Sequence, residues 1–181
     1  MIRSPLLGLG AFGCTLAALF AAAPVTGQGG TSLKGHNTDA PVDFAADRIE
    51  VQDRADRVVF SGNVQATQGN LRMSASRVTV AYAQGGGNGT QIQRMEASGG
   101  VTLRSPSETA VSQFAIYDIP RRLVTMIGGV RLDQRGNHVQ GGRLVLDLDS
   151  GRVVMDGGAA GAPGQTGRVT GRFTVPRRTN G

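Results

Sequence analysis

The sequence has no tryptophan, a single cysteine and two histidines among its 181 residues, and aromatic residues make up only 4% of it. One cysteine excludes a disulfide framework. So few thiols and imidazoles also leave neither a zinc-binding cluster nor a cysteine–histidine pair for nucleophilic catalysis. The shortage of aromatic side chains removes the stacking platform that single-stranded nucleic acid needs. The sequence therefore predicts no catalytic residue, no metal site, no cofactor and no nucleic-acid partner.

Long hydrophobic runs are absent too, except near the N-terminus. There Arg3 precedes the uncharged residues 6–22, and this run closes with the small residues Ala21–Ala23. This order is typical of a secretory signal peptide. We place the signal peptide at residues 1–27, with the mature chain starting between residues 24 and 30, so the sequence predicts an exported protein.

A retained membrane anchor at residues 6–22 is the alternative, because these 17 residues approach the minimum length of a membrane-spanning helix. Beyond the signal peptide we expect a flexible segment at residues 28–40, one folded domain at residues 41–176 and a basic tail at residues 177–181. No other segment of the sequence is apolar over a length that could span a bilayer.

Acidic residues are fewer than basic ones, since 13 Asp and Glu stand against 19 Lys and Arg, and the net charge is +6. Loss of residues 1–27 would remove only one of these charges, that of Arg3. All the basic residues except Lys34 are arginines, whose guanidinium groups suit bidentate contacts with phosphate or carboxylate. A basic, exported chain of this kind favours an anionic glycolipid as partner.

Glycine is abundant, with 28 residues, and the chain from residue 40 onward alternates between apolar and polar side chains. Alternation with a period of two predicts strands with one apolar face. Four stretches share the pattern around a central glycine, namely Val58 to Ala66, Met95 to Leu103, Val124 to Leu132 and Val153 to Ala159. We interpret them, with the strands between them, as an internal repeat of about 29 residues.

These strands predict an all-β fold. Successive strands pair antiparallel as a meander, and two layers close over the apolar faces to give a twisted sandwich or β-jelly roll. The first and last strands remain as open edges, where another chain can add. The residues that we expect at these assembly edges are Val42, Phe44, Ile49, Val169, Phe173 and Val175.

The repeated glycines at positions 62, 99, 128 and 157 have two interpretations. They mark β-bulges or tight bends where a side chain would clash. Alternatively, four inward positions without a side chain leave room for a long apolar guest. A further glycine-rich stretch, Gln84 to Thr90, is expected to form a long flexible hairpin loop.

Several of these segments resemble the LptA/OstA family. The resemblance rests on Pro41 to Val51, on the strand Val58-Val-Phe-Ser-Gly-Asn-Val64 with the turn Thr67-Gln-Gly69, and on Met73 to Tyr82. The family pattern is an acid-containing strand, a Phe-x-Gly-Asn-Val strand, a Gln-Gly turn and a hydrophobic strand that ends in tyrosine. The resemblance continues more loosely to Val175 and covers most of the mature chain.

The resemblance implies a periplasmic carrier of lipopolysaccharide, or of a related anionic glycolipid, with a β-jelly-roll fold. Such proteins join head to tail into a bridge between an LptC-like inner-membrane protein and an LptD-like outer-membrane protein. The acyl chains would lie in an apolar interior slot. By position, the slot-lining residues would be Ile49, Val51, Phe60, Val64, Leu71, Met73, Val78, Val80, Met95, Leu103, Phe114, Ile116, Met126, Leu132, Leu144 and Leu146.

Two other interpretations stay open. A structural or adhesive β-repeat protein would have the same strand pattern with a filled core and no lipid. The membrane-anchored LptC-like member of the transport system would keep residues 6–22 as its anchor.

Overall fold

The structure is a computed structural model, which describes residues 36–85, 89–158 and 167–174. Within these ranges the chain forms one antiparallel sheet of ten strands and a single turn of 3-10 helix, η1 (Asp53–Ala55). The strands are β1 (Asp43–Ala45), β2 (Arg48–Gln52), β3 (Arg57–Gln68), β4 (Leu71–Gly85), β5 (Gly89–Arg104), β6 (Glu108–Asp118), β7 (Leu123–Gln134), β8 (Asn137–Asp147), β9 (Val153–Asp156) and β10 (Thr170–Arg172). The predicted all-β fold is confirmed. The predicted signal peptide and basic tail lie outside the described residues.

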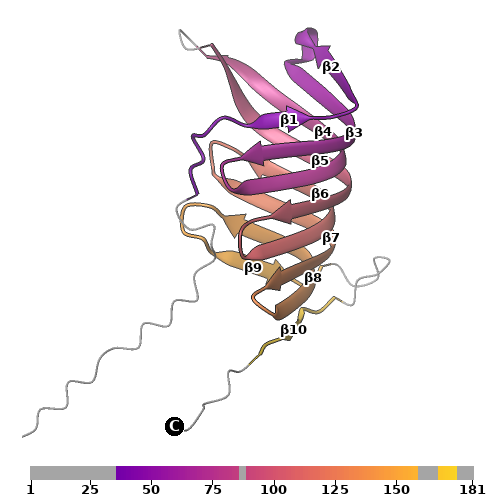
Figure 1. Ribbon diagram of the computed structural model, residues 1–181, viewed down its shortest axis with the longest axis vertical. Helices are drawn as coiled ribbons and strands as arrows, with labels where there is room; N and C mark the ends of the chain where they lie inside the picture. Colours follow the sequence, from indigo (N-terminus) through magenta and orange to yellow (C-terminus); the bar gives the residue numbers. More distant parts are fainter. Residues whose placement is uncertain (1–35, 86–88, 159–166, 175–181) are drawn as a thin grey trace, which may run out of the picture.

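Consecutive strands pair as an antiparallel meander from β3 to β8. At one end of the sheet β3 pairs with both β1 and β2, and at the other end β8 pairs with both β9 and β10. The sheet therefore has two strands at each edge, one in each layer. The sequence predicted a single strand at each edge. Figure 1 shows β2 standing out at the top of the molecule and β10 at the bottom.

The two layers arise because each long strand bends and its two halves face each other. In β5, for example, Met95 in the first half and Leu103 in the second half line the same cavity. Figure 1 shows the strands curving together on one side of the molecule, while the hairpin turns gather along the other side, which we call the open side. The interior between the layers is the slot.

β-bulges mark the middle of the long strands and coincide with the repeated glycines. The register shifts between Ser98 and Val101, where Gly99 and Gly100 both have positive φ, at +82° and +79°. Equivalent shifts occur at Gly62-Asn63 and at Gly128-Gly129, which also have positive φ. The left-handed region is open to glycine and tolerated by asparagine. The bulge interpretation is thus correct for three of the four glycines.

The alternative interpretation, that these glycines leave room in the slot, is wrong. A Cβ built on Gly99 would lie 2.7 Å from the Cβ of Ser76, and one on Gly62 would lie 2.4 Å from Oδ2 of Asp47. Both neighbours are exposed, so the missing side chains would point outward. Gly157 differs from the other three because it follows the end of β9 and approaches the backbone of Gly167.

The loop between β4 and β5 is shorter than the glycine-rich stretch from which the sequence predicted it. Gln84 pairs with Thr90, and Gly85 pairs with Gly89, so the ladder continues into the predicted loop. Residues 86–88, which join the two strands, lie outside the described residues.

The core is a single cluster of apolar side chains in the slot. Its most deeply buried large members are Met126, Leu144, Leu148, Val64, Val78, Val101 and Val130. At the β1 end, Phe44 and Phe60 stack with ring centroids 4.4 Å apart, joining one layer to the other. Aromatic pairs of this kind contribute about 0.5–1.5 kcal/mol beyond their buried area. The Phe44–Phe60 pair therefore holds the two layers together next to the edge formed by β1 and β2.

Candidate functional site: the slot between the two layers

Continuous rows of apolar side chains line the slot, because residues directly opposite one another in antiparallel strands lie on the same face. Pairing from strand to strand gives one row of Phe60, Val78, Ala97, Ala115, Met126 and Leu144. A second row beside it consists of Val58, Val80, Met95, Tyr117, Val124 and Leu146. The facing layer has a row of Phe44, Ala66, Met73, Leu103, Ala110 and Leu132. The lining of the slot is therefore mainly apolar from one end of the sheet to the other.

Twelve of the sixteen residues predicted to line the slot lie in it. The structure buries Phe60, Val64, Leu71, Val78, Val80, Met95, Leu103, Met126, Leu144 and Leu146 within the core cluster. Met73 and Leu132 are half-buried and pack against the cluster. Their role in binding lipid stays a prediction.

The predicted inward orientation is wrong for Phe114 and Ile116. Phe114 is 55% exposed, and the two residues alternate with Ala115 and Tyr117, which are buried in the slot. The cause is the bulge between Val111 and Phe114, which shifts the inward phase of β6 by one residue. A one-residue shift moves every following side chain to the opposite face.

Ile49 and Val51 were also predicted to line the slot, but they are 60% and 58% exposed. Ile49 is paired with Phe60, and Val51 with Val58, so both extend the apolar rows of the slot. They are exposed because β2 lies at the edge of the sheet, and in Figure 1 no strand of the other layer lies over it. These two residues form an uncovered apolar edge rather than part of the closed interior.

The other residues predicted at the edges lie near the two ends of the sheet. Phe44 belongs to β1 and Val42 immediately precedes it, while Val169 and Phe173 flank β10. Phe173 is 68% exposed and lies against Gly171. Val175 lies outside the described residues. Their part in assembly stays a prediction.

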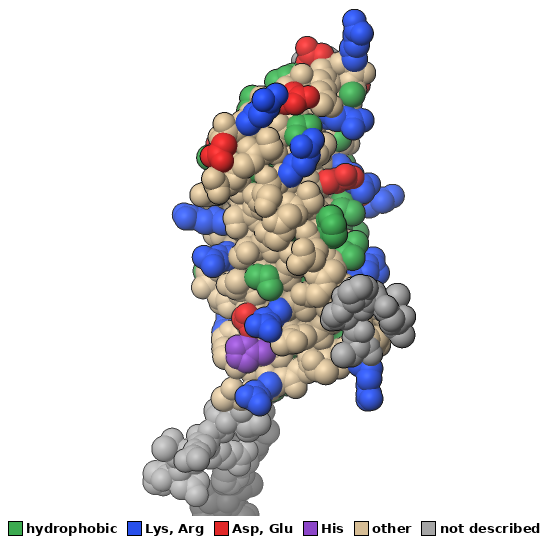
Figure 2. All heavy atoms as spheres, turned by 90° about the vertical axis from the view of Figure 1, so that its right-hand side faces the viewer, with side chains coloured by type: hydrophobic (Ala, Val, Ile, Leu, Met, Phe, Trp, Pro, Cys, Tyr) green, Lys and Arg blue, Asp and Glu red, His purple; other side chains and the backbone are tan. Residues whose placement is uncertain are grey.

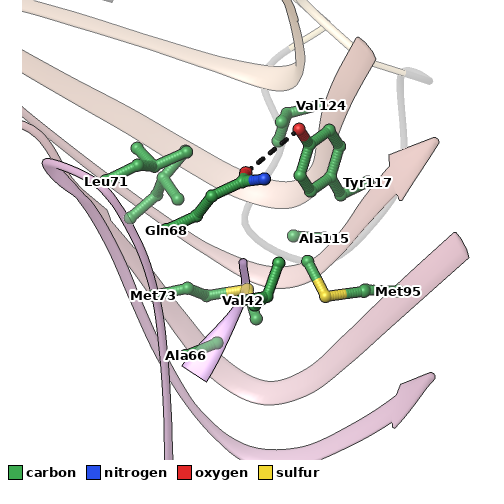
Figure 3. Close-up of a pocket in the computed structure, with 10 residues that line it drawn as sticks. Val42, Ala66, Gln68, Leu71, Met73, Met95, Ala115, Tyr117 and Val124 are labelled. Atoms are coloured by element: carbon green, nitrogen blue, oxygen red, sulfur yellow. Dashed lines mark hydrogen bonds between the residues drawn. The ribbon is translucent and has the colours of Figure 1, made fainter. Parts of the chain in front are cut away.

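The space left in the slot is small. A cavity of about 30 Å³ lies among residues of both layers, including Met73, Leu103, Met95 and Val124. Figure 3 labels Met73, Met95 and Val124 among the residues that line it. A second cavity of about 20 Å³ lies farther along the slot, next to Leu132 and Val153. Each has room for about one or two water molecules. An acyl chain therefore requires the two layers to separate or side chains to move.

One buried polar group interrupts the apolar lining of the first cavity. Gln68, which is only 5% exposed, accepts a hydrogen bond from the hydroxyl of Tyr117 at 3.2 Å. Figure 3 shows this bond across the slot. Gln68 was not among the predicted slot residues, although it continues the inward phase of Val64 and Ala66 and so carried a sequence signal.

The Tyr117 hydroxyl is expected to stay protonated to unusually high pH. Burial raises the pKa of this phenol to about 12, although the nearby Arg122 charge lowers it. An unfolded tyrosine ionises near pH 10. The folded state therefore holds the phenol proton of Tyr117 more tightly than the unfolded state. This difference in pKa contributes about 2–3 kcal/mol to the free energy of unfolding below pH 10, and the contribution is lost as the pH rises through about 12.

Ultraviolet titration can test this pKa, because the chain has only two tyrosines. In a Tyr82→Phe variant the remaining phenol is Tyr117, and we expect its tyrosinate absorbance to rise with a midpoint near pH 12. The same variant in strong denaturant serves as the control and should titrate near pH 10. A native midpoint near 10 would contradict the burial of Tyr117.

A second buried polar group lines the far cavity. Glu108 is buried there and accepts a hydrogen bond from the amide of Gln134 at 3.0 Å. The hydroxyl of Ser105 also hydrogen-bonds to this carboxylate. No feature of the alternating pattern distinguished Glu108 from an exposed acidic residue at a strand start.

The outer faces of the layers are polar and rich in arginine. Figure 2 shows one side of the molecule, where cationic side chains are spread along its whole height and acidic ones are fewer. Arg72 and Arg104 lie directly opposite each other at the open-side ends of β4 and β5. Both line a shallow hollow of about 300 Å³ with Thr67 and Thr102. Two like charges held face to face attract an anion.

The described residues contain no group of three or more His, Cys, Asp and Glu side chains that could hold a metal ion. Asp147, the last residue of β8, and Asp149, in the turn that follows, are both engaged in other contacts. Asp147 accepts hydrogen bonds from the backbone N–H groups of Asp149 and Ser150, each at 3.0 Å, and the Ser150 bond is the main cause of its lowered pKa. Asp149 pairs with Arg122 at 2.9 Å. No helix in the described part of the chain is long and apolar enough to cross a membrane.

Comparison with known proteins identifies relatives of this chain. A family model described as LptA/(LptD N-terminal domain) LPS transport protein matches residues 44–152. An uncharacterized protein of Rhizobium meliloti is 30% identical over 158 residues, with 84% of each chain covered. The lipopolysaccharide export system protein LptA of Escherichia coli is 27% identical over 118 residues, and the chain spans only 60% of that protein. A crystal structure of LptH, the LptA homologous periplasmic component of the lipopolysaccharide transport device of Pseudomonas aeruginosa, has the same fold. Its TM-score is 0.67 at 21% identity, over 77% of this chain and 99% of that one.

Proposed function

The chain belongs to the LptA/(LptD N-terminal domain) family of LPS transport proteins, and from this premise we propose that it carries lipopolysaccharide through the periplasm as one unit of a protein bridge. The observation that supports this function best is the three continuous rows of apolar side chains that line the slot. Burial of acyl chains there would contribute roughly 0.8 kcal/mol per CH₂ group. Transfer would be passive and involve no covalent step.

The anionic headgroup would remain outside the slot on the open side. Arg72 and Arg104 support this arrangement, because they lie at strand ends next to the inward residues Leu71 and Leu103. Neither arginine has an acidic partner among the described residues. Phosphates at this rim would therefore gain charge-assisted hydrogen bonds while the acyl chains lie between the layers.

Directional transfer requires the slots of successive units to be continuous, and the edges of the sheet are suited to this. Each edge consists of short strands, β1 and β2 at one end and β9 and β10 at the other. Unpaired strand edges add further strands readily. We propose head-to-tail joining of units through these edges, with an LptC-like inner-membrane protein and an LptD-like outer-membrane protein at the ends of the bridge.

Export to the periplasm depends on residues 1–27, which we propose as a cleaved signal peptide. The anchored, LptC-like alternative would retain residues 6–22. Both segments lie outside the described residues, so the mass of the mature protein from its native envelope distinguishes the two proposals.

The small cavities are the observation that favours the rival function, a structural β-repeat protein with a filled core. Site-specific crosslinking distinguishes the two. A photo-reactive amino acid at Met73, which lines the slot, is expected to crosslink to lipopolysaccharide in cells. Immunoblotting of the purified protein for lipopolysaccharide would detect the adduct.

The neighbouring residue Ser74 provides a matched control for this experiment. It is exposed on the outer face of the same strand, so the photo-reactive group there should give no adduct. Absence of the adduct at both positions in a folded, correctly exported protein would favour the structural β-repeat protein. Equal crosslinking at both positions would place the lipid outside the slot.

A further inference from the structure

Residues 36–42, which we call the strap, lie along the open side of the molecule before β1 begins. Figure 1 shows this segment running past the ends of the strands rather than away from the sheet. Although the sequence predicted a flexible segment up to residue 40, Thr38 is buried at 7% exposure. The strap therefore packs against the folded domain.

Gln68 holds the strap to the layer that contains the second half of β3. Its Nε2 donates hydrogen bonds to the backbone carbonyl oxygens of Thr38, at 2.8 Å, and Ala40, at 2.9 Å. His36 Nε2 lies 3.3 Å from Oε1 of the same amide, and His36 Nδ1 lies 3.0 Å from Oδ1 of Asn70 in the adjoining turn. One buried amide group thus makes most of the contacts that fix the strap.

The strap also contacts the other layer. Arg122, in the turn after β6, lies 3.6 Å from Asp39 of the strap. The Tyr117 hydroxyl of β6 reaches the strap only indirectly, because it donates to Oε1 of Gln68. Because its partners come from both layers, the strap crosses the open side of the slot. Val42 at its end is one of the residues that line the first cavity, and Figure 3 shows it between Met73 and Met95.

An amide buried in an apolar slot has a consequence for binding. While the strap is in place, the donors and acceptor of Gln68 are satisfied by the backbone of the strap and by Tyr117. Two neutral hydrogen bonds shift an equilibrium by roughly tenfold to a hundredfold, so such a closure is firm but reversible. A lipid that enters from the open side has to displace the strap to reach the first cavity.

We propose that the strap is a gate on the open side of the slot and that Gln68 is its latch. This inference rests on the proposed function, because it assumes that the slot takes up lipid. The closed strap keeps the slot narrow in the absence of lipid. Its displacement opens the first cavity to acyl chains, which then replace Val42 among the slot-lining side chains.

Replacing the latch tests the proposal. Gln68→Met keeps the length of the side chain and removes both donors, and Gln65→Met is the matched control on the exposed face of the same strand. In Gln68→Met we expect amide hydrogen exchange of residues 36–42 to rise at least about tenfold. Uptake of purified lipid A, measured by stopped-flow fluorescence with a labelled lipid, should become several-fold faster. The control should change neither rate.

Different outcomes test the gate and the carrier function separately. Faster exchange of the strap without faster uptake would overturn the gate and leave the carrier function in place. Unchanged exchange in Gln68→Met would overturn the role of the latch. If neither the parent nor the variant takes up lipid A, the carrier function fails and the gate with it. If Gln68→Met does not fold, Tyr117→Phe removes one bond to the latch and should raise both rates by a smaller factor.

Discussion

Replacement of Ile49 and Val51 together by glutamate is expected to abolish head-to-tail association while the domain remains folded. Both side chains extend the apolar rows of the slot onto β2, where they are 60% and 58% exposed. Substitution of such exposed residues costs little stability, whereas charged side chains on an edge strand block the addition of another strand. We expect the parent to form concentration-dependent oligomers in analytical ultracentrifugation and the double variant to sediment as a monomer.

The opposite face of β2 provides the control for this prediction. Glu50 alternates with Ile49 and Val51, so Glu50→Gln changes the charge of the same strand without altering its apolar face. This variant should oligomerise like the parent, and the melting temperatures of all three proteins should agree within a few degrees. Oligomers that persist in the double glutamate variant would show that units associate through surfaces other than the β2 edge.

The loss of association should also stop transport if the bridge is correct. Cells that contain only the double glutamate variant would then accumulate newly made lipopolysaccharide on the inner-membrane side. The crosslink from position 73 to lipopolysaccharide should persist in this variant, because Met73 lies within a single unit. The double glutamate variant would thereby separate the binding of lipopolysaccharide by one unit from its transfer to the next unit.

The alternating pattern was sufficient to predict the fold and most of the slot. A period of two assigns side chains to faces without knowledge of the partner strand, and so residues such as Val64, Met95 and Leu144 were correctly placed inside. The Phe-x-Gly-Asn-Val and Gln-Gly segments predicted the LptA/OstA family, and the match over residues 44–152 confirms it. The proposed internal repeat stays a prediction.

The errors arose where the period breaks or where a residue's neighbours decide its exposure. Phe114 follows a bulge that the sequence does not mark on β6, because the glycines lie on the neighbouring strands β5 and β7. The alternating pattern assigned Ile49 to the correct face of the sheet. Its side chain is exposed because no strand of the other layer covers β2, and only the topology of the sheet shows this. Gln68 was overlooked because a polar residue at a strand end resembles a turn residue until its partners in the strap are known.

Substitution of Gly99, in the bulge of β5, is expected to lower the stability of the two-layered sheet strongly. Gly99 has φ +82°, and an added Cβ would approach the Cβ of Ser76 to 2.7 Å and its Oγ to 2.8 Å. A left-handed backbone costs a non-glycine residue about 1–2 kcal/mol, and overpacking adds about 1–3 kcal/mol. We therefore expect Gly99→Ala to lower the free energy of unfolding by about 2–5 kcal/mol in urea titrations.

Two further variants separate backbone strain from the steric clash. Gly100 has a similar φ of +79° but nothing within 4 Å of an added Cβ, so Gly100→Ala should lose only about 1–2 kcal/mol. Removal of the Ser76 side chain relieves the clash at Gly99, although Ser76→Gly alone also loses the hydrogen bond from its hydroxyl to the Gly99 carbonyl. In a double-mutant cycle, Gly99→Ala should therefore cost less in the Ser76→Gly background. The alternative result is an equal loss of unfolding free energy on Gly99→Ala with and without the Ser76 side chain. In that case backbone strain at the bulge, and not contact between adjacent strands, would make glycine necessary where the sheet folds over to form the slot.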